Sequence, residues 1–349
     1  MQELEEVLRA HGARYPAMEA ADYVKLVYQT EFGGDAPAAA VPVGCAGVER
    51  ASDASSGPLC EPIGDGLCRV PAAALPPEAA PALDRLAAVT AGEAAASEER
   101  FLEKLGLLRR LCAAGELPLG SAALEAFLTP YLAAGPRPVP HSAAYRAAYA
   151  PCYRVLRQSY TDLLPVFLEA ERVAARGGVL AVDGRCASGK STLAALLGRV
   201  YGCPVFHLDD FFLTPELRTP ERFAQPGGNV HYERFEEEIL RPFTQGKEVV
   251  FRAFDCHALA MKPPVSVPAA PFAVAEGCYA LHPSLRGYYA GAVFLTHSKE
   301  KQRQRLLARS GPEMLRRFEQ EWIPLEERYF SACGVEAQCG VTLDTTELF

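Results

Sequence analysis

The sequence is short of positive charge. It has only seven lysines in 349 residues, and 43 acidic residues exceed 35 basic ones, which gives a formal net charge of −8. This balance argues against a general nucleic-acid or membrane-surface binder, because a phosphate-rich surface requires a basic face on the protein. We therefore expect neither nucleic acid nor membrane among its partners.

Paired cysteines and long apolar runs are also missing. None of the 11 cysteines forms a Cys-x-x-Cys pair, so their spacing predicts no zinc site. No apolar run reaches the roughly 18 residues that a membrane span needs, and the first residues do not read as a secretory signal. We expect a cytoplasmic protein. Its length and its 49% hydrophobic residues suit two globular domains.

One motif is specific. Residues 184–192 read Gly-Arg-Cys-Ala-Ser-Gly-Lys-Ser-Thr, follow the apolar run 178–182 and open a helix-like run over 192–201. They match G-x-x-x-x-G-K-[ST], a loop whose backbone N–H groups, from about residue 186 to 191, point at phosphate oxygens. Lys190 is expected to reach the β- and γ-phosphates of ATP, and the Ser191 hydroxyl to bind Mg²⁺. The predicted nucleotide-binding residues of this loop are Gly184, Ala187, Ser188, Gly189, Lys190, Ser191 and Thr192.

The first part of the chain reads as mainly helical. Helices are predicted over 3–10, 17–31, 79–88, 97–114, 121–133 and 142–172, the last with interruptions at Pro151 and Pro165, while 33–77 is irregular and no strand periodicity dominates. The flexible segment Arg176-Gly177-Gly178 ends the long helical run and indicates a domain boundary nearby. We predict a helical domain of unassigned role over 1–173 and a second domain over 174–349.

The second domain alternates strand-like and helical runs. Strands are predicted over 179–182, 205–208, 249–254, 272–275, 293–296 and 341–344. This alternation predicts an α/β fold with a parallel sheet and helices on both faces. Ligands of such sheets bind at the carboxyl ends of the strands. Four strands run directly into an acid, and these acids are Asp183, Asp209, Asp255 and Glu276.

These features together resemble the uridine kinase branch of the P-loop kinases. Besides the phosphate loop, the resemblance rests on His-Leu-Asp-Asp-Phe-Phe at 207–212, Pro-Gly-Gly-Asn at 226–229, Phe-Asp at 254–255, Glu-Gly at 276–277 and an arginine-rich run before Trp322. It covers under half of the chain. It implies the three-layer P-loop kinase fold and ATP- and Mg²⁺-dependent transfer of the γ-phosphoryl group to a hydroxyl.

The resemblance also implies roles for individual residues. Asp209 corresponds to the base that accepts the proton of the attacking hydroxyl, with Asp210 as the alternative. Glu276 would hold Mg²⁺ through water beside Ser191. Arg309, with Arg303 and Arg305, corresponds to lid arginines that neutralise the transferred group. The implied catalytic residues are Asp209, Lys190 and Arg309; Arg305 would contact the nucleotide; the implied substrate contacts are Asp209, Phe212, Asn229, Tyr232 and Asp255.

The acceptor stays open at this point. A nucleoside of the uridine or cytidine kind leads, and pantothenate, a sugar phosphate or glycerate are alternatives. A different class is a regulatory module that senses ATP and engages a protein partner through its helical part. Either could act as a homodimer.

An aromatic stripe marks the helical part. His141, Tyr145, Tyr149 and Tyr153 recur at four-residue steps, which places helical members on one face. Such a stripe is typical of core or interface packing, and the alternative is a binding surface.

Overall fold

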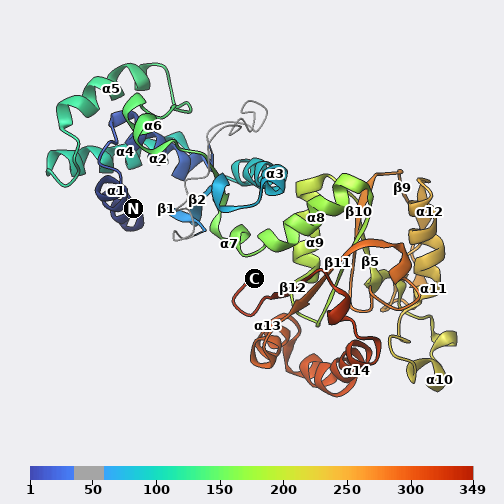
Figure 1. The fold of residues 1–349 in the computed structure, drawn as a ribbon. Coiled ribbons are helices and arrows are strands. Elements are labelled where there is room, and N and C mark those ends of the chain that lie inside the picture. The colour runs from blue at the N-terminus through green and yellow to red at the C-terminus, as the bar shows by residue number, and fades with distance from the viewer. Residues whose placement is uncertain (35–58, 349) are drawn as a thin grey trace. The chain divides into compact units, whose positions relative to one another are not determined.

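The computed structural model describes residues 1–34 and 59–348. The chain divides into two compact units, Met1–Asp162 and Leu163–Phe349 (Figure 1). The division precedes the predicted boundary at 173/174, because the helix over 164–176 lies with the second unit. None of the helices in the described ranges is long and apolar enough to span a membrane.

The first unit contains the helices that the sequence predicts up to residue 133. Local signals fix their ends: the Ser97 side chain accepts a hydrogen bond from the Arg100 N–H at one helix start, and Gly33 ends another with φ of 68°. The helices of this unit are α1 (Gln2–Arg14), α2 (Ala20–Phe32), α3 (Ala80–Gly92), α4 (Glu98–Ala113), α5 (Ser121–Ala133), α6 (Ala143–Tyr149) and α7 (Gln158–Thr161).

The first unit is mainly helical, as expected, but it also contains a small sheet that the sequence did not predict. An antiparallel sheet joins β1 (Glu61–Gly64), β2 (Leu67–Pro71) and β3 (Tyr153–Arg157) in the order β1-β2-β3. The predicted helix over 142–172 therefore breaks at β3. Its Val155 and Leu156 are buried, and β3 gains its hydrogen-bonding partner only from β2, far away in sequence. Such pairing overrides a local helical pattern.

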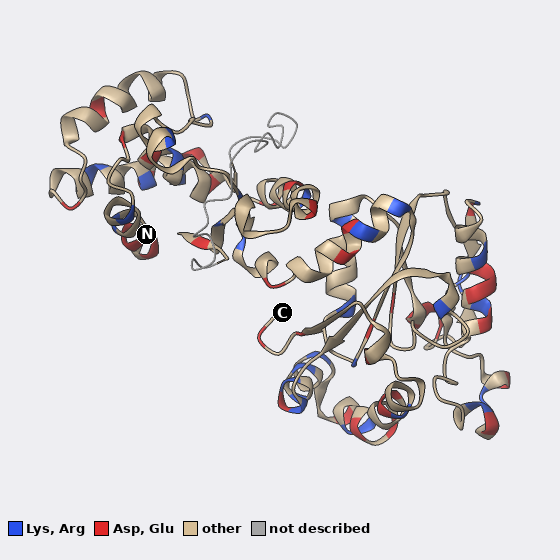
Figure 2. Ribbon diagram, in the orientation of Figure 1, with Lys and Arg blue, Asp and Glu red and all other residues tan. Residues whose placement is uncertain are grey.

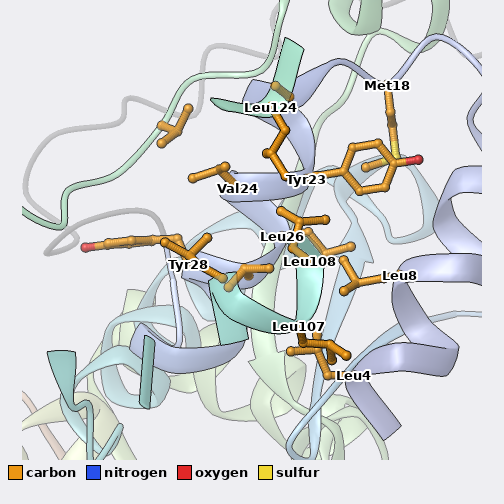
Figure 3. Close-up of a cluster of buried hydrophobic side chains, with 14 of the residues drawn as sticks. Leu4, Leu8, Met18, Tyr23, Val24, Leu26, Tyr28, Leu107, Leu108 and Leu124 are labelled. Carbon is orange, nitrogen blue, oxygen red and sulfur yellow. The ribbon is translucent and has the colours of Figure 1, made fainter. Parts of the chain in front are cut away.

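The core of the first unit lies between α1, α2, α4 and α5. Figure 3 shows Leu4 and Leu8 of α1 with Tyr23 and Leu26 of α2 in this cluster, and all four side chains are at most 4% exposed. Their spacing at three and four residues puts them on the inner face of each helix. Burial of this face is what holds the short helices together.

The aromatic stripe joins this core. The rings of His141 and Tyr145 stack at 4.2 Å, and Tyr145 meets Tyr149 edge to face at 4.8 Å. Nδ1 of His141 also lies 2.7 Å from Oδ1 of Asp22, and Nε2 of His141 lies 2.6 Å from the Tyr153 hydroxyl oxygen. These contacts favour the packing interpretation, because the rings and polar atoms of the stripe find their partners within the first unit.

The second unit is built on a parallel five-stranded sheet, as predicted. Its strand order is β12-β11-β4-β10-β5, and every neighbouring pair is parallel. The phosphate loop follows the central strand. The strands are β4 (Gly178–Gly184), β5 (Val205–His207), β10 (Phe272–Glu276), β11 (Tyr289–Thr296) and β12 (Val341–Asp344).

Helices cover both faces of this sheet, which gives the three-layer P-loop kinase fold (Figure 1). On one face α8 (Leu164–Arg176) packs against β4, β11 and β12, and α9 (Lys190–Tyr201) against β10, β4 and β5. On the other face Ala181 and Phe294 pack with Tyr329 and Phe330. The remaining helices are α10 (Pro220–Phe223), α11 (Tyr232–Phe235), α12 (Arg241–Thr244), α13 (Lys299–Arg317) and α14 (Ile323–Cys333).

The predicted strand over 249–254 is not part of this sheet. It divides into β6 (Val249–Phe251), paired antiparallel with β9 (Val265–Val267), and β7 (Phe254–Asp255), paired antiparallel with β8 (Ala260–Met261). Local antiparallel pairing satisfies these short strands and leaves the parallel sheet at five strands. Asp255 therefore does not end a strand of the main sheet, contrary to expectation.

Candidate active site

The phosphate loop has the backbone conformation that its glycines allow. Gly184 has φ of 144°, and a Cβ there would lie 2.2 Å from the Leu295 carbonyl oxygen, so only glycine fits between β4 and β11. Gly189 has φ of 91° and caps α9. The N–H groups of the first turn of α9 have no helical acceptors and carry the positive end of the helix dipole. The loop can therefore receive an anion.

Lys190 lies folded over this loop. Its Nζ donates to the carbonyl oxygens of Gly184, at 2.8 Å, and Arg185, at 3.0 Å, and the residue is 9% exposed. Burial works against the charged form, but acidic groups that include Glu326 and Glu276 outweigh it, so the pKa of Lys190 is raised. The ammonium group is thus charged and held at the loop.

Glu276 joins the phosphate loop to the end of β5. Its Oε1 accepts a hydrogen bond from the Ser191 hydroxyl at 3.1 Å and lies 2.5 Å from Nδ1 of His207. The hydrogen bond to Glu276 is the main reason why the pKa of His207 is raised. Nothing in the local sequence pairs His207 with an acid, because His207 and Glu276 lie on different strands that only the sheet brings together.

Asp209 stands directly after β5, in a turn of 3-10 helix over Leu208–Phe211. Asp209 as a whole residue is exposed, while Phe211 on the same turn is buried. Desolvation by surrounding protein raises the pKa of Asp209; Lys190 opposes this and Glu276 adds to it. Asp209, Lys190 and Glu276 therefore act on one another electrostatically. Asp210, the alternative base, is half-buried on the same turn.

Asp183 is a structural acid. It is fully buried and accepts hydrogen bonds from the Gly184 N–H at 2.7 Å, the Leu281 N–H at 2.9 Å and the Tyr329 hydroxyl at 2.8 Å. These donors occupy the carboxyl group. Asp255 also has a structural role, since it accepts hydrogen bonds from the N–H groups of His257 and Ala258 in its hairpin. Asp183, Asp209 and Glu276 all interact electrostatically with Lys190, but the Asp183 carboxyl group is already taken up by its three donors.

Glu326 was not anticipated from the sequence. It belongs to α14, is 5% exposed and accepts a hydrogen bond from the Cys186 N–H at 3.0 Å. That N–H was expected to point at phosphate and instead holds the loop to α14. Burial raises the pKa of Glu326, and Lys190 opposes the rise. In the sequence, the one feature that marks Glu326 is that it directly follows the apolar residues Ile323, Pro324 and Leu325.

The arginines of α13 differ in their contacts. Arg305 donates to the carbonyl oxygens of Ala187 at 3.2 Å and of Thr345 and Leu348, so it joins the last residues of the chain to the phosphate loop. The Arg309 guanidinium lies 5.5 Å from the centre of the Phe318 ring. Arg303 pairs with Glu319 at 3.3 Å. Figure 2 shows basic and acidic residues interleaved along α13 and α14.

Three predicted substrate contacts lie on the segment that follows Asp209. Phe212 forms an antiparallel bridge with Val230, and the Asn229 side chain is hydrogen-bonded to Tyr279. The Tyr232 ring has the His282 ring at 3.8 Å and the Arg222 guanidinium at 4.1 Å. Stacked neighbours of this kind leave Tyr232 little face for a substrate ring.

The donor set at the loop suits a hard cation. Among the described residues no three His, Cys, Asp or Glu side chains gather in a way that could hold a metal ion by themselves. Mg²⁺ commonly keeps several waters and binds one or two protein oxygens together with substrate phosphates. The Ser191 hydroxyl and the Glu276 carboxylate, 3.1 Å apart, offer such oxygens.

No known family profile matches the sequence, and no curated protein matches it. Solved structures do. A possible uridine kinase from Bacillus stearothermophilus is 18% identical, with 48% of this chain and 89% of that chain covered and a TM-score of 0.39. A proposed fructose transport system kinase from Silicibacter sp. is 18% identical, with 53% and 97% covered and a TM-score of 0.42. A shikimate kinase from Bacteroides thetaiotaomicron is 14% identical, with 48% and 85% covered and a TM-score of 0.26. Over about half its length the chain is similar to uridine kinase-like and other P-loop kinases.

Proposed function

We propose that the protein is a kinase that transfers the γ-phosphoryl group of ATP to a hydroxyl group of a small molecule. One observation carries the proposal: Glu276 lies 3.1 Å from the Ser191 hydroxyl of the phosphate loop and 2.5 Å from His207, at the end of the strand that leads to Asp209. Phosphoryl transfer needs little more than such positioning and charge.

Each residue has a defined task in this proposal. Lys190 would stabilise the β- and γ-phosphate oxygens, and Ser191 and Glu276 would hold Mg²⁺, which neutralises phosphate charge when bound. Asp209 would orient the acceptor hydroxyl and take its proton. Desolvation raises the pKa of Asp209, which makes its carboxylate a better proton acceptor than an unperturbed aspartate.

A nucleoside is the first acceptor to test. The Asp-Asp-Phe-Phe and Pro-Gly-Gly-Asn segments that resemble the uridine kinase branch lie beside one another through the bridge between Phe212 and Val230. Pantothenate, sugar phosphates and glycerate are the alternative acceptors.

The test is ADP release from ATP in the presence of Mg²⁺ and one acceptor at a time. Uridine, cytidine, pantothenate, glycerate and sugar phosphates form the panel, with Lys190→Ala as the inactive control. Acceptor-dependent ADP release that Lys190→Ala abolishes supports the proposal. Tight ATP binding with no stimulation by any acceptor contradicts it and favours a module that senses ATP without transferring phosphate.

A further inference from the structure

The first unit contains a cavity of about 440 Å³. Small-molecule pockets in proteins commonly measure about 300–1,000 Å³, so a metabolite fits. All of its lining residues belong to Met1–Asp162, and none belongs to the candidate active site. The charged side chains of its lining are Glu31, Asp65, Glu93, Arg100, Glu103, Lys104 and Arg157.

The deepest charges of the cavity are a buried ion pair. Nζ of Lys104 lies 2.9 Å from Oε2 of Glu31, and the two side chains are 8% and 2% exposed. Lys104 also donates to Asp65 Oδ2 at 2.6 Å and to the Thr30 carbonyl oxygen at 3.1 Å. Burial works to raise the pKa of Glu31, but hydrogen bonds from Arg100 and Lys104 lower it on balance. Lys104 and Glu31 thus both have hydrogen-bonding partners within the protein, and they form the buried side of the cavity.

The two arginines at the cavity are more exposed than Lys104, although each is hydrogen-bonded: Arg100 to Glu31 and the Ala95 carbonyl oxygen, and Arg157 to the carboxylate and carbonyl oxygens of Glu93. Arg100 is 53% exposed and pairs with Glu31 at 2.8 Å, yet Glu31 also accepts from Lys104 and from the Ser97 N–H at 2.7 Å. Arg157 is 37% exposed and pairs with Glu93 at 2.7 Å. Glu93 also accepts from the Tyr160 hydroxyl at 2.7 Å. Either guanidinium can therefore turn toward a ligand without leaving a buried carboxylate unpaired.

We propose that this cavity binds a small polar metabolite with one anionic group, a carboxylate or a phosphate, which Arg100 and Arg157 hold. Guanidinium groups match both anions with paired hydrogen bonds. The neighbouring carboxylates of Glu93 and Asp65 accept hydrogen bonds from hydroxyl or ammonium groups on the same ligand. A neutral sugar or a bare cation lacks the group that the arginines require.

The test is isothermal titration calorimetry on the full chain. The probes are glycerol 3-phosphate and glucose 6-phosphate for the phosphate arm, aspartate and serine for the carboxylate arm, and glycerol and glucose as uncharged counterparts. We expect binding by members of one charged arm and none by the uncharged counterparts. Failure of every charged probe at 10 mM, or equal binding by the counterparts, overturns the proposal; the 10 mM ceiling is about ten times the upper end of usual metabolite affinities.

Two variants locate the site. Arg100→Gln is expected to weaken binding roughly tenfold or more, on the scale of one charge-assisted pair. Ala95→Phe, which adds bulk at the lining of the cavity and keeps every charge, is expected to weaken binding at least as much. The matched control is Arg109→Gln, because Arg109 also lies on α4 and pairs with an exposed glutamate, Glu125 at 2.7 Å, but does not line the cavity.

A phosphate-bearing probe can also bind the phosphate loop. Binding that survives both cavity variants and disappears in Lys190→Ala would assign the ligand to that loop and overturn the proposal. Circular dichroism spectra equal to that of the unmodified chain establish that each variant is folded. The proposal is independent of kinase activity, so a failed acceptor screen does not affect it.

Discussion

The Ser191 hydroxyl donates a hydrogen bond to Oε1 of Glu276 across 3.1 Å, from the first turn of α9 to the end of β10. The same oxygen lies 2.5 Å from Nδ1 of His207 at the end of β5. Because β10 lies between β4 and β5 in the sheet, Glu276 connects the phosphate loop with the strand that leads to Asp209.

Replacing Lys190 with alanine should lower turnover by roughly two orders of magnitude or more, as for other single preorganised charges. The loop would lose the cation that now lies on the Gly184 and Arg185 carbonyl oxygens. The rate of ADP release at a saturating acceptor concentration measures this turnover. Lys247→Ala, which alters an exposed lysine of the same unit, should retain full turnover, and a comparable loss there would contradict a specific role.

Glu276→Gln should raise the Mg²⁺ concentration for half-maximal activity by roughly tenfold, the lower end of effects seen when groups around a metal change. The amide keeps the shape of the side chain but loses the charge. A Mg²⁺ titration of the rate measures the shift. Glu221→Gln, a change at an exposed carboxylate, is the matched control. An unchanged Mg²⁺ requirement in Glu276→Gln would exclude Glu276 from metal binding.

Asp209→Asn should lower kcat with little change in ATP affinity, because a base acts on the acceptor and not on the nucleotide. Asp210→Asn decides between the neighbouring acids: the variant with the larger kcat loss identifies the base. A marked loss of ATP affinity in Asp209→Asn would make that residue a metal ligand instead.

The pH dependence of the rate follows from the same residue. Desolvation raises the pKa of Asp209 above its usual value of 3.8, and only the ionised carboxylate can accept a proton. The rate should therefore rise with pH through this raised pKa and fall as pH decreases below it. A kcat profile from pH 4 to 8 checks the sign, and a profile that falls with increasing pH over that range would be inconsistent with a carboxylate base.

Glu61 should make the first unit sensitive to acid. Burial works to raise its pKa, but the His11 ring, whose Nε2 lies 3.5 Å from Oε2, and the hydrogen bond from the Tyr15 hydroxyl lower it to about 2 from 4.5. A lowered pKa stabilises the fold fully above the unfolded value, and this stability is lost as pH falls from about 4.5 to about 2. The contribution amounts to about 3.5 kcal/mol at about 1.4 kcal/mol per pKa unit.

Urea unfolding of Glu61→Gln and the unmodified chain at pH 7 and pH 3 tests this. Circular dichroism reports both units, while the single tryptophan, Trp322, reports the second. The free energy of unfolding of the first unit should depend less on pH in Glu61→Gln, and Glu6→Gln, at an exposed residue of α1, should match the unmodified chain. An equal pH dependence in all three would refute the assignment.

A fragment over 163–349 should be more stable than one over 174–349. The buried Leu164, Val166, Phe167 and Val173 of α8 pack in the second unit, and each buried side chain of this size contributes about 1.5–3 kcal/mol. Thermal unfolding followed by Trp322 fluorescence compares the two fragments. Equal melting temperatures would show that α8 is dispensable and that the later boundary is adequate.

Local pattern alone determined much of the second unit. The spacing of Gly184, Gly189 and Lys190 requires a tight turn followed by a helix, and alternating apolar runs require a parallel sheet. The position of an acid directly after a buried strand brings Asp209 and Glu276 to the same edge, since the carboxyl ends of parallel strands meet there. These properties depend on neighbours in the chain, so the sequence is sufficient to predict them.

Only the tertiary structure decided which groups meet across the chain. Asp183 and Asp255 also follow apolar runs, but Asp183 is occupied by Tyr329 and Leu281, and Asp255 lies in a hairpin. Glu326 reaches the Cys186 N–H from a helix 140 residues away, and β3 exists because β2 pairs with it. Such contacts depend on packing between segments that are distant in the chain. The spacing of neighbouring residues carries no information about the free energy of that packing.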